Sequence, residues 1–422
     1  MAGPDGHGQS DGPRAVLFAR DAAVHGRLAR VGDLLIATLD QRHGPSPTGQ
    51  VALTGIGAFD LASGETTDLA SGETTWTVWA MPALAGVDEA TAYAYSRSGL
   101  VVALNLDGSE RWRTRVPDDR APGARARGDR DGPFVGDIVS DGSCVTLAAG
   151  AELLRLATAT GEIVARTTAC AGARAVVSRI ALARDGAIVA TCTQKTDWDD
   201  ERERIEPQLW QPIATLESLR TAPGTVEAFD ANLRRLWSLP PVPGIVYGDR
   251  RPATTADGTI ILTAARTVET AGQRYVSVLH DWIVAVDGRS GAVVWQRDMP
   301  GGRGYVDPLV VADAVVAGYE LTAYALADGL VRWQLPTEQV KPDRTAAPIP
   351  DGDRLLVASN GAIRAISVRD GISSDLARFA GVPFIGAVTT NLLHAGRYLY
   401  LGVREGRQPT QLRAVAVRGP SR

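Results

Sequence analysis

The feature that most limits the fold of this chain is a unit that recurs along almost its whole length. Each copy has an apolar run, a turn of the Asp-Gly or Ser-Gly kind, and a second run that holds a tryptophan. The clearest copy reads Ala285-Val286-Asp287, then Ser290-Gly291, then Val293-Val294-Trp295. Apolar residues at every second position are typical of β-strands. Because one such unit cannot bury both of its faces alone, we predict that the copies stack as a single repeat architecture.

Seven positions correspond to the tryptophan of this unit, and two of them hold smaller residues, Ala165 and a residue near Leu376. A large indole on the outer strand would fill the gap between neighbouring sheets, and its burial removes about 200 Å² from water. We therefore interpret these side chains as structural, and Trp76, Trp198, Trp210 and Trp282 fall outside the pattern. The expected blade anchors are Phe18, Trp79, Trp112, Trp237, Trp295 and Trp333.

The two ends of the chain complement each other. The last unit, residues 384–417, has no outer strand after it, and the apolar run at residues 15–21 is similar to the strand that holds Trp295. Pairing of the first strand with the last unit would remove the exposed sheet edges that otherwise promote aggregation. We predict an all-β fold, an eight-bladed β-propeller over residues 14–418, closed by a strand at 14–24. A flexible leader (1–13) and a tail (419–422) flank it.

The recurring motif resembles the tryptophan-docking repeat of the pyrroloquinoline-quinone-like (PQQ-like) propellers, and the resemblance covers nearly the whole chain. Quinone-dependent alcohol dehydrogenases of this kind cover their quinone with a vicinal disulfide and hold Ca²⁺ with oxygen ligands. This chain has no adjacent cysteines and no oxygen-rich ligand run. It is more similar to the non-catalytic propellers, namely the lipoprotein that assists outer-membrane barrel assembly and the propellers attached to bacterial Ser/Thr kinases.

The resemblance therefore implies a binding or scaffolding propeller, with another protein as partner and no cofactor. The alternative is an enzyme that uses the central funnel, as a lyase, a hydrolase or a quinone-dependent oxidoreductase. The five histidines are scattered and lack the spacing of a zinc site or a catalytic triad, so we expect no metal and assign no catalytic residue.

Charge and cysteine content narrow the function further. The net charge is −4, and this gives no electrostatic support for nucleic-acid binding. The three cysteines, Cys144, Cys170 and Cys192, are few and odd in number, which argues against a disulfide framework. Since each lies in or beside a β-like run, we expect all three to be small buried hydrophobic residues.

Residues 1–14 are rich in Gly, Pro and Asp and contain no apolar core of a signal peptide. No run of 18 apolar residues occurs, so we expect no transmembrane helix. The sequence as it stands indicates a cytoplasmic protein. A signal removed when the chain was defined would instead make it extracytoplasmic, in the periplasm or at the cell surface.

Two regions are candidate binding sites. The starts of the inner strands should form the mouth of the central channel, where arginine beside aspartate can bind a carboxylate or a sugar-like ligand. The other interpretation is a hydrated channel whose charges pair with one another. The expected mouth residues are Asp137, Arg250, Arg251, Tyr305, Asp307, Arg344 and Phe384.

The second candidate is the long insertion at residues 195–221, which mixes charged residues with Trp198 and Trp210. Long loops on a rigid scaffold often carry function, and tryptophan is a common interface anchor. The insertion either contacts a partner at the rim or folds back and packs its own tryptophans on the propeller.

Overall fold

The structure is a computed structural model, and it describes the following parts of the 422-residue chain. They are residues 16–18, 23–41, 53–60, 74–79, 84–95, 99–116, 135–171, 175–194, 224–239, 245–247, 251–268, 277–299, 307–318, 320–342, 346–359, 361–378, 388, 390–395, 398–403 and 411–416. The structure does not describe the side chains at a few strand positions, among them residues 16–18, 23–26 and 74–79.

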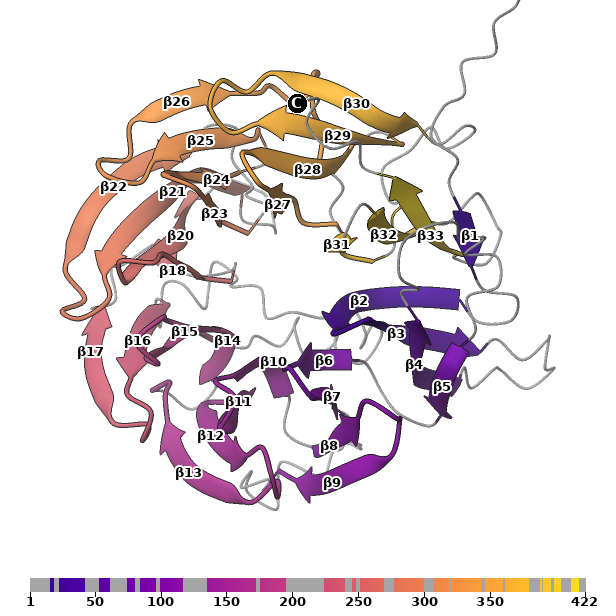
Figure 1. The fold of residues 1–422 in the computed structure, drawn as a ribbon. Coiled ribbons are helices and arrows are strands. Elements are labelled where there is room, and N and C mark those ends of the chain that lie inside the picture. Colours follow the sequence, from indigo (N-terminus) through magenta and orange to yellow (C-terminus); the bar gives the residue numbers. More distant parts are fainter. Residues whose placement is uncertain are drawn as a thin grey trace, which may run out of the picture.

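All regular elements in these ranges are β-strands, and they form eight antiparallel sheets arranged as a ring (Figure 1). Seven sheets are each formed by one continuous segment, and we number them blades 1 to 7 in chain order. The first strand of each blade lies nearest the centre of the ring and the last lies at its outer rim (Figure 1). The expected all-β propeller is therefore confirmed.

The strands of the first four blades have these bounds. Blade 1 holds β2 (Ala23–Val31), β3 (Leu34–Gln41), β4 (Leu53–Asp60) and β5 (Thr74–Trp79). Blade 2 holds β6 (Leu84–Val87), β7 (Thr91–Tyr95), β8 (Leu100–Asn105) and β9 (Glu110–Arg115). Blade 3 holds β10 (Val135–Ser140), β11 (Cys144–Ala149), β12 (Glu152–Ala157) and β13 (Ile163–Thr168). Blade 4 holds β14 (Ala175–Leu182), β15 (Ile188–Gln194), β16 (Thr225–Phe229) and β17 (Arg235–Leu239).

The remaining three blades follow the same order. Blade 5 holds β18 (Ile245–Tyr247), β19 (Ala253–Thr254), β20 (Thr259–Val268), β21 (Ser277–Asp287) and β22 (Val293–Met299). Blade 6 holds β23 (Leu309–Val311), β24 (Ala314–Ala317), β25 (Thr322–Ala325) and β26 (Val331–Gln334). Blade 7 holds β27 (Ile349–Asp351), β28 (Arg354–Ser359), β29 (Ala362–Ser367) and β30 (Ser373–Arg378).

The eighth sheet is a composite of both ends of the chain. It consists of β31 (Leu393–Ala395), β32 (Tyr398–Val403), β33 (Gln411–Ala416) and β1 (Val16–Phe18), in the order β31-β32-β33-β1. Strand β1 runs antiparallel to β33, with Val16 opposite Ala414 and Phe18 opposite Leu412. The chain thus has seven continuous blades, not eight, because the sheet in the remaining place of the ring is not made by one segment.

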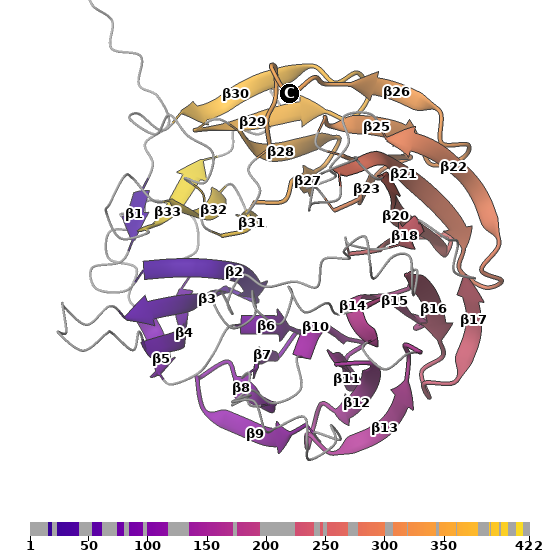
Figure 2. The same cartoon turned by 180° about the vertical axis from the view of Figure 1, so that it is seen from behind.

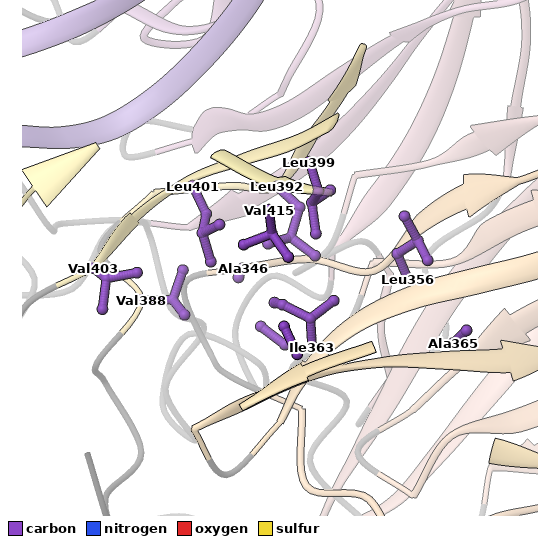
Figure 3. Close-up of a cluster of buried hydrophobic side chains, with 12 residues drawn as sticks. Ala346, Leu356, Ile363, Ala365, Val388, Leu392, Leu399, Leu401, Val403 and Val415 are labelled. Carbon is purple, nitrogen blue, oxygen red and sulfur yellow. The ribbon is translucent and has the colours of Figure 1, made fainter. Parts of the chain in front are cut away.

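The composite sheet packs on both of its neighbours. Toward blade 7, Leu399, Leu401 and Val415 join a buried cluster with Leu356 and Ile363 (Figure 3). Toward blade 1, Ala395 and Tyr400 lie in a cluster with other buried side chains, Leu28, Leu35 and Phe59 among them. Strand β2 of blade 1 contacts β31, β32 and β33, so the composite sheet and blade 1 are neighbours in the ring (Figure 2).

Position within a blade decides the burial pattern. All four residues of the central strand β24, Ala314–Ala317, are buried, because this strand is covered on both faces by neighbouring blades. The outer strand β22 instead buries Trp295 and Met299 and exposes Val293, Val294 and Gln296. Continuous apolar runs at the centre and alternating runs at the rim therefore follow from the same stacking.

Candidate binding site in the central channel

The inner strands of blades 1 to 5 surround a cavity of about 230 Å³ in the channel. Each of these blades contributes at least one residue, and blades 2 and 3 contribute three each. The lining residues are Arg27, Gly86, Val87, Tyr93, Ile138, Val139, Ser140, Leu182 and Arg251. Two of these described lining residues are cationic and none is a carboxylate, so the cavity wall carries positive charge.

The two arginines come from distant blades. Arg27 is on β2, and one of its guanidinium nitrogens donates a hydrogen bond to the carbonyl oxygen of Ala85 in blade 2. Arg251 precedes β19 of blade 5, and its backbone N–H donates to Oδ1 of Asp307 at 3.3 Å. The second bond joins blade 5 to the segment before β23 of blade 6, so it fixes the chain where Arg251 enters the cavity wall.

A tyrosine–aspartate pair supports one side of the cavity. The hydroxyl of Tyr93 donates to Oδ2 of Asp88, and the Ser140 hydroxyl donates to the same oxygen at 3.3 Å. Burial, together with the bond to Asp88, raises the pKa of Tyr93 far above its ordinary value. The phenol therefore stays protonated and acts as a hydrogen-bond donor at this position.

The structure places only some of the expected mouth residues. Arg251 and Asp307 lie together as described above, and Asp137 lies on β10 with its side chain outside the description. Arg250, Tyr305, Arg344 and Phe384 fall outside the described residues, as do Trp198 and Trp210 in the insertion. The sequence did not predict that Arg27 lines the cavity, because nothing in a β-run shows which way a single arginine side chain points.

The tryptophans on four outer strands share one geometry at the blade junctions. Each side chain is at most 8% exposed, and each indole Nε1–H donates to a backbone carbonyl of the next blade. The ring also lies against a glycine of positive φ in that blade's outer hairpin. The pairs are Trp112 with Thr158 O and Gly161, Trp237 with Gly288 O and Gly291, Trp295 with Leu326 O and Gly329, and Trp333 with Val368 O and Gly371. We call each such arrangement a tryptophan dock.

Strand register corrects the anchor expected in blade 1. In blades 2, 4, 5 and 6 the docking tryptophan pairs with an alanine immediately before an irregularity, as Trp295 pairs with Ala285. In blade 1 the residue in this position is Trp76, opposite Ala58, whereas Trp79 lies opposite Gly55. By strand register, Trp76 rather than Trp79 holds the position of the docking tryptophans, three residues earlier than the sequence comparison assumed, and the side chains of both residues lie outside the described part of the structure.

Two other expected anchors are only partly described. Phe18 lies on β1 opposite Leu412, and its side chain is outside the description. Leu376 of β30 packs against the buried cluster between blade 7 and the composite sheet. By register the residue at the docking position of β30 is the neighbouring Ala377, opposite Ile363. Among the described residues, this junction is filled by aliphatic side chains rather than an indole.

The junction between blades 3 and 4 lacks a dock and is built in another way. Ala165 occupies the position of the tryptophan, and it pairs with Arg155 where the other blades have alanine. The hairpin residue that meets it in blade 4 is Leu233, which has a φ of 58° and is 4% exposed. A leucine in this left-handed conformation costs about 1–2 kcal/mol. Its side chain fills space that an indole fills elsewhere.

Arg155 is almost fully buried at this junction. Its guanidinium lies 2.6 Å from Oδ2 of Asp141 on the inner hairpin of the same blade. Burial alone would raise the pKa of Asp141, but hydrogen bonds from Cys144 and Ser143 and the charge of Arg155 hold it below its usual range. Asp141 is thus ionised at neutral pH and compensates the buried cation.

A disulfide crosses the same junction. Cys170, which follows β13 of blade 3, is bonded to Cys192 on β15 of blade 4, with a Cα–Cα distance of 5.6 Å. The expectation that all three cysteines are unpaired hydrophobic residues was wrong for these two. Cys170 and Cys192 are 22 residues apart in sequence, but the packing of blade 3 on blade 4 brings them together. Cys144 is a free, partly buried thiol.

The described parts of the chain contain no group of three or more His, Cys, Asp or Glu side chains that could hold a metal ion. Among the same residues, no helix is long and apolar enough to cross a membrane.

Comparison with known proteins identifies the family. The model of the family described as outer membrane protein assembly factor BamB matches residues 62–197 and 222–401. These ranges are well over half of the chain. The chain belongs to this family of PQQ-like propellers. No curated protein sequence matches it.

Solved structures similar to this BamB-family chain share its fold at low sequence identity. BamB from Moraxella catarrhalis is 14% identical, with a TM-score of 0.55, and the match covers 95% of this chain and 100% of that one. The Dos1 propeller is 10% identical, with a TM-score of 0.59 and coverages of 96% and 95%. Sqt1 from Saccharomyces cerevisiae is 9% identical, with a TM-score of 0.56 and coverages of 96% and 98%. At these identities the similarity demonstrates the propeller fold alone.

Proposed function

We propose that this chain is a non-catalytic scaffold that binds a protein partner, and that the central channel takes an acidic side chain or carboxylate terminus of that partner. The observation that carries the proposal is the wall of the channel cavity, where Arg27 and Arg251 are the charged residues. Arginine binds carboxylates with two parallel hydrogen bonds when the geometry allows it. Membership of a family described as an assembly factor supports a binding role.

The composite sheet is part of this proposal as the eighth blade of the ring. Asn391, which precedes β31, accepts from the N–H of Leu28 at 2.5 Å and donates to the carbonyl oxygen of Leu28 at 3.1 Å. These bonds connect the C-terminal sheet to β2 and support a ring closed on both sides. A closed ring gives the channel a rigid wall, which reduces the entropy lost on binding.

We also propose an extracytoplasmic location. The support is the disulfide Cys170–Cys192, since disulfides persist in oxidising compartments and are rare in the cytosol. The insertion at residues 195–221, with Trp198 and Trp210, is proposed as a second partner contact on the rim.

The channel is tested with a pair of synthetic nonapeptides, one rich in Asp and Glu and one with Asn and Gln in their places. Fluorescence anisotropy should show binding of the acidic peptide only, and Arg27→Gln with Arg251→Gln should weaken it at least tenfold. Equal binding of both peptides, or an unchanged affinity in the variant, would contradict the channel site.

The scaffold role is tested by affinity capture from the native source, with the intact chain and a variant lacking residues 195–221. A stoichiometric protein that the variant loses supports the proposal and places one contact on the insertion. A small molecule retained in native mass spectrometry, with no protein partner, would favour the enzyme alternative instead.

A further inference from the structure

The disulfide occurs at a junction that lacks a tryptophan dock. Docks are described at the junctions of blades 2 and 3, 4 and 5, 5 and 6, and 6 and 7. At the junction of blades 3 and 4 the outer strand has Ala165 instead, and this junction is crossed by Cys170–Cys192. Cys170 and Cys192 are 2% and 4% exposed and belong to the cluster that contains Leu233.

We infer that the disulfide locks this junction and takes over the role that a tryptophan dock has at the four docked junctions. A dock holds two blades by one buried ring and one hydrogen bond to a carbonyl, as Trp333 holds blade 7 through Val368. Ala165 offers neither. A covalent bond between the segment after β13 and strand β15 restricts the separation of the two blades directly.

The residues at this junction differ from those at the docked junctions in a way that supports the inference. Arg155 is large where the docked blades have alanine, and Leu233 replaces the glycine on which an indole would rest. A β-carbon at the equivalent Gly291 would lie 2.8 Å from the ring of Trp237, so leucine and a docked indole exclude each other. The junction therefore cannot return to a dock by one substitution, and the disulfide is the link between the two blades that the described residues show in its place.

Reduction is a balanced two-electron step. A dithiol such as dithiothreitol breaks the bond between the two sulfur atoms, supplies two electrons and two protons to give the thiols of Cys170 and Cys192, and itself becomes a cyclic disulfide. Because both sulfur-bearing residues are buried, the dithiol reaches them only when the blades separate. Reduction then leaves this junction with packing alone, while the docked junctions are unaffected.

The test is hydrogen exchange followed by mass spectrometry on the full chain. In Cys170→Ser with Cys192→Ser, amides of β13 and β14 should exchange at least tenfold faster than in the unsubstituted protein, and those of β22 and β26 should not change. Trp333→Ala is the matched control, and it should accelerate exchange in β26 and β30 only. Uniform acceleration over all blades, or no change at β13 and β14, would overturn the inference.

A second measurement uses no substitution. Alkylation of the denatured protein without reductant should label one thiol, Cys144, and reductant should raise the number to three. Treatment with dithiothreitol in mild urea, followed by return to buffer, should reproduce the local exchange of the serine variant. Three labelled thiols in unreduced protein prepared from an oxidising compartment would show that the lock does not form and would overturn the inference.

A transplanted dock provides the complementary result. Arg155→Ala, Ala165→Trp and Leu233→Gly, combined with the two serine substitutions, should return exchange at β13 and β14 to the slow rate. A folded transplant that still exchanges fast would contradict the equivalence of disulfide and dock.

Discussion

The ring of Trp295 in blade 5 lies so close to Gly329 in blade 6 that a β-carbon on residue 329 would come within 2.6 Å of a ring carbon. Gly329 also has a φ of 72°, a backbone conformation that residues with a β-carbon rarely adopt. Each junction of this kind therefore depends on two residues from different blades, and changes at either should act on the same interface.

Gly329→Ala is expected to lower the free energy of unfolding by more than about 3 kcal/mol, because it combines backbone strain with a clash against the indole. Gly352→Ala is the matched control, since its φ is 63° and a β-carbon there meets no atom within 4 Å. We expect it to cost only about 1–2 kcal/mol. Urea unfolding measures both, and equal losses would contradict the close contact.

Trp76→Ala should destabilise the protein by about 3–5 kcal/mol, because its strand register matches that of the docking tryptophans in the other blades. Trp79→Ala should cost clearly less, because Trp79 lies opposite Gly55 and away from the docking register. Thermal unfolding of the two variants distinguishes them. A larger loss for Trp79→Ala would restore the assignment made from the sequence.

Asp141→Asn should lower stability by about 3 kcal/mol, because it leaves the buried guanidinium of Arg155 without its counter-charge. The control is Asp313→Asn, since Asp313 pairs with Arg332 but its side chain is 76% exposed. Exposed ion pairs contribute little to stability, so this variant should be nearly neutral. Chemical denaturation at neutral pH provides the comparison, and similar losses in the two variants would argue against a buried charge pair.

The stability contributed by Glu227 should depend on pH. Burial raises the pKa of this carboxyl, while the charge of Arg235 opposes the shift. Because the pKa of Glu227 is raised in the folded state, the carboxyl adds to the free energy of unfolding below its ordinary pKa of about 4.3. This stabilisation is lost as the pH rises through the pKa of the folded state.

Glu227→Gln cannot ionise, so its stability relative to the unsubstituted protein should increase as pH rises from about 4 toward neutrality. Unfolding free energies measured at a series of pH values test this. Parallel curves for the two proteins would show that Glu227 ionises without penalty.

Removal of residues 1–22 deletes β1 and should lower the melting temperature, because β33 loses its partner and becomes an open edge. Concentration-dependent aggregation should accompany the loss. Removal of residues 1–13 leaves β1 intact and should change neither property. An unaltered melting temperature in the longer deletion would exclude β1 from the ring.

The sequence was sufficient for the fold because stacking of blades requires a periodic pattern that recurs in register. For blade 1 the sequence reading selected Trp79, although a signal for the register position of Trp76 existed. Trp76 follows Gly72 by four residues, as Trp295 follows Gly291, but an earlier copy of the same segment around Gly64 obscured this spacing.

The junction of blades 3 and 4 was less predictable. Leu233 in a left-handed conformation, the buried Arg155 and the Cys170–Cys192 bond depend on contacts between blades that a repeat pattern does not encode. The same holds for Arg27, because its place in the cavity wall depends on how the blades come together in the ring.

Strand β1 has a consequence for how the molecule is made. Val16 pairs with Ala414, so the contact that completes the composite sheet cannot form on the ribosome until nearly the entire polypeptide has been translated. The seven continuous blades rest on local hairpins and can form earlier, in order of synthesis. A nascent chain halted before β33 is therefore an open arc with an exposed final blade, vulnerable to proteases and to pairing with other nascent chains.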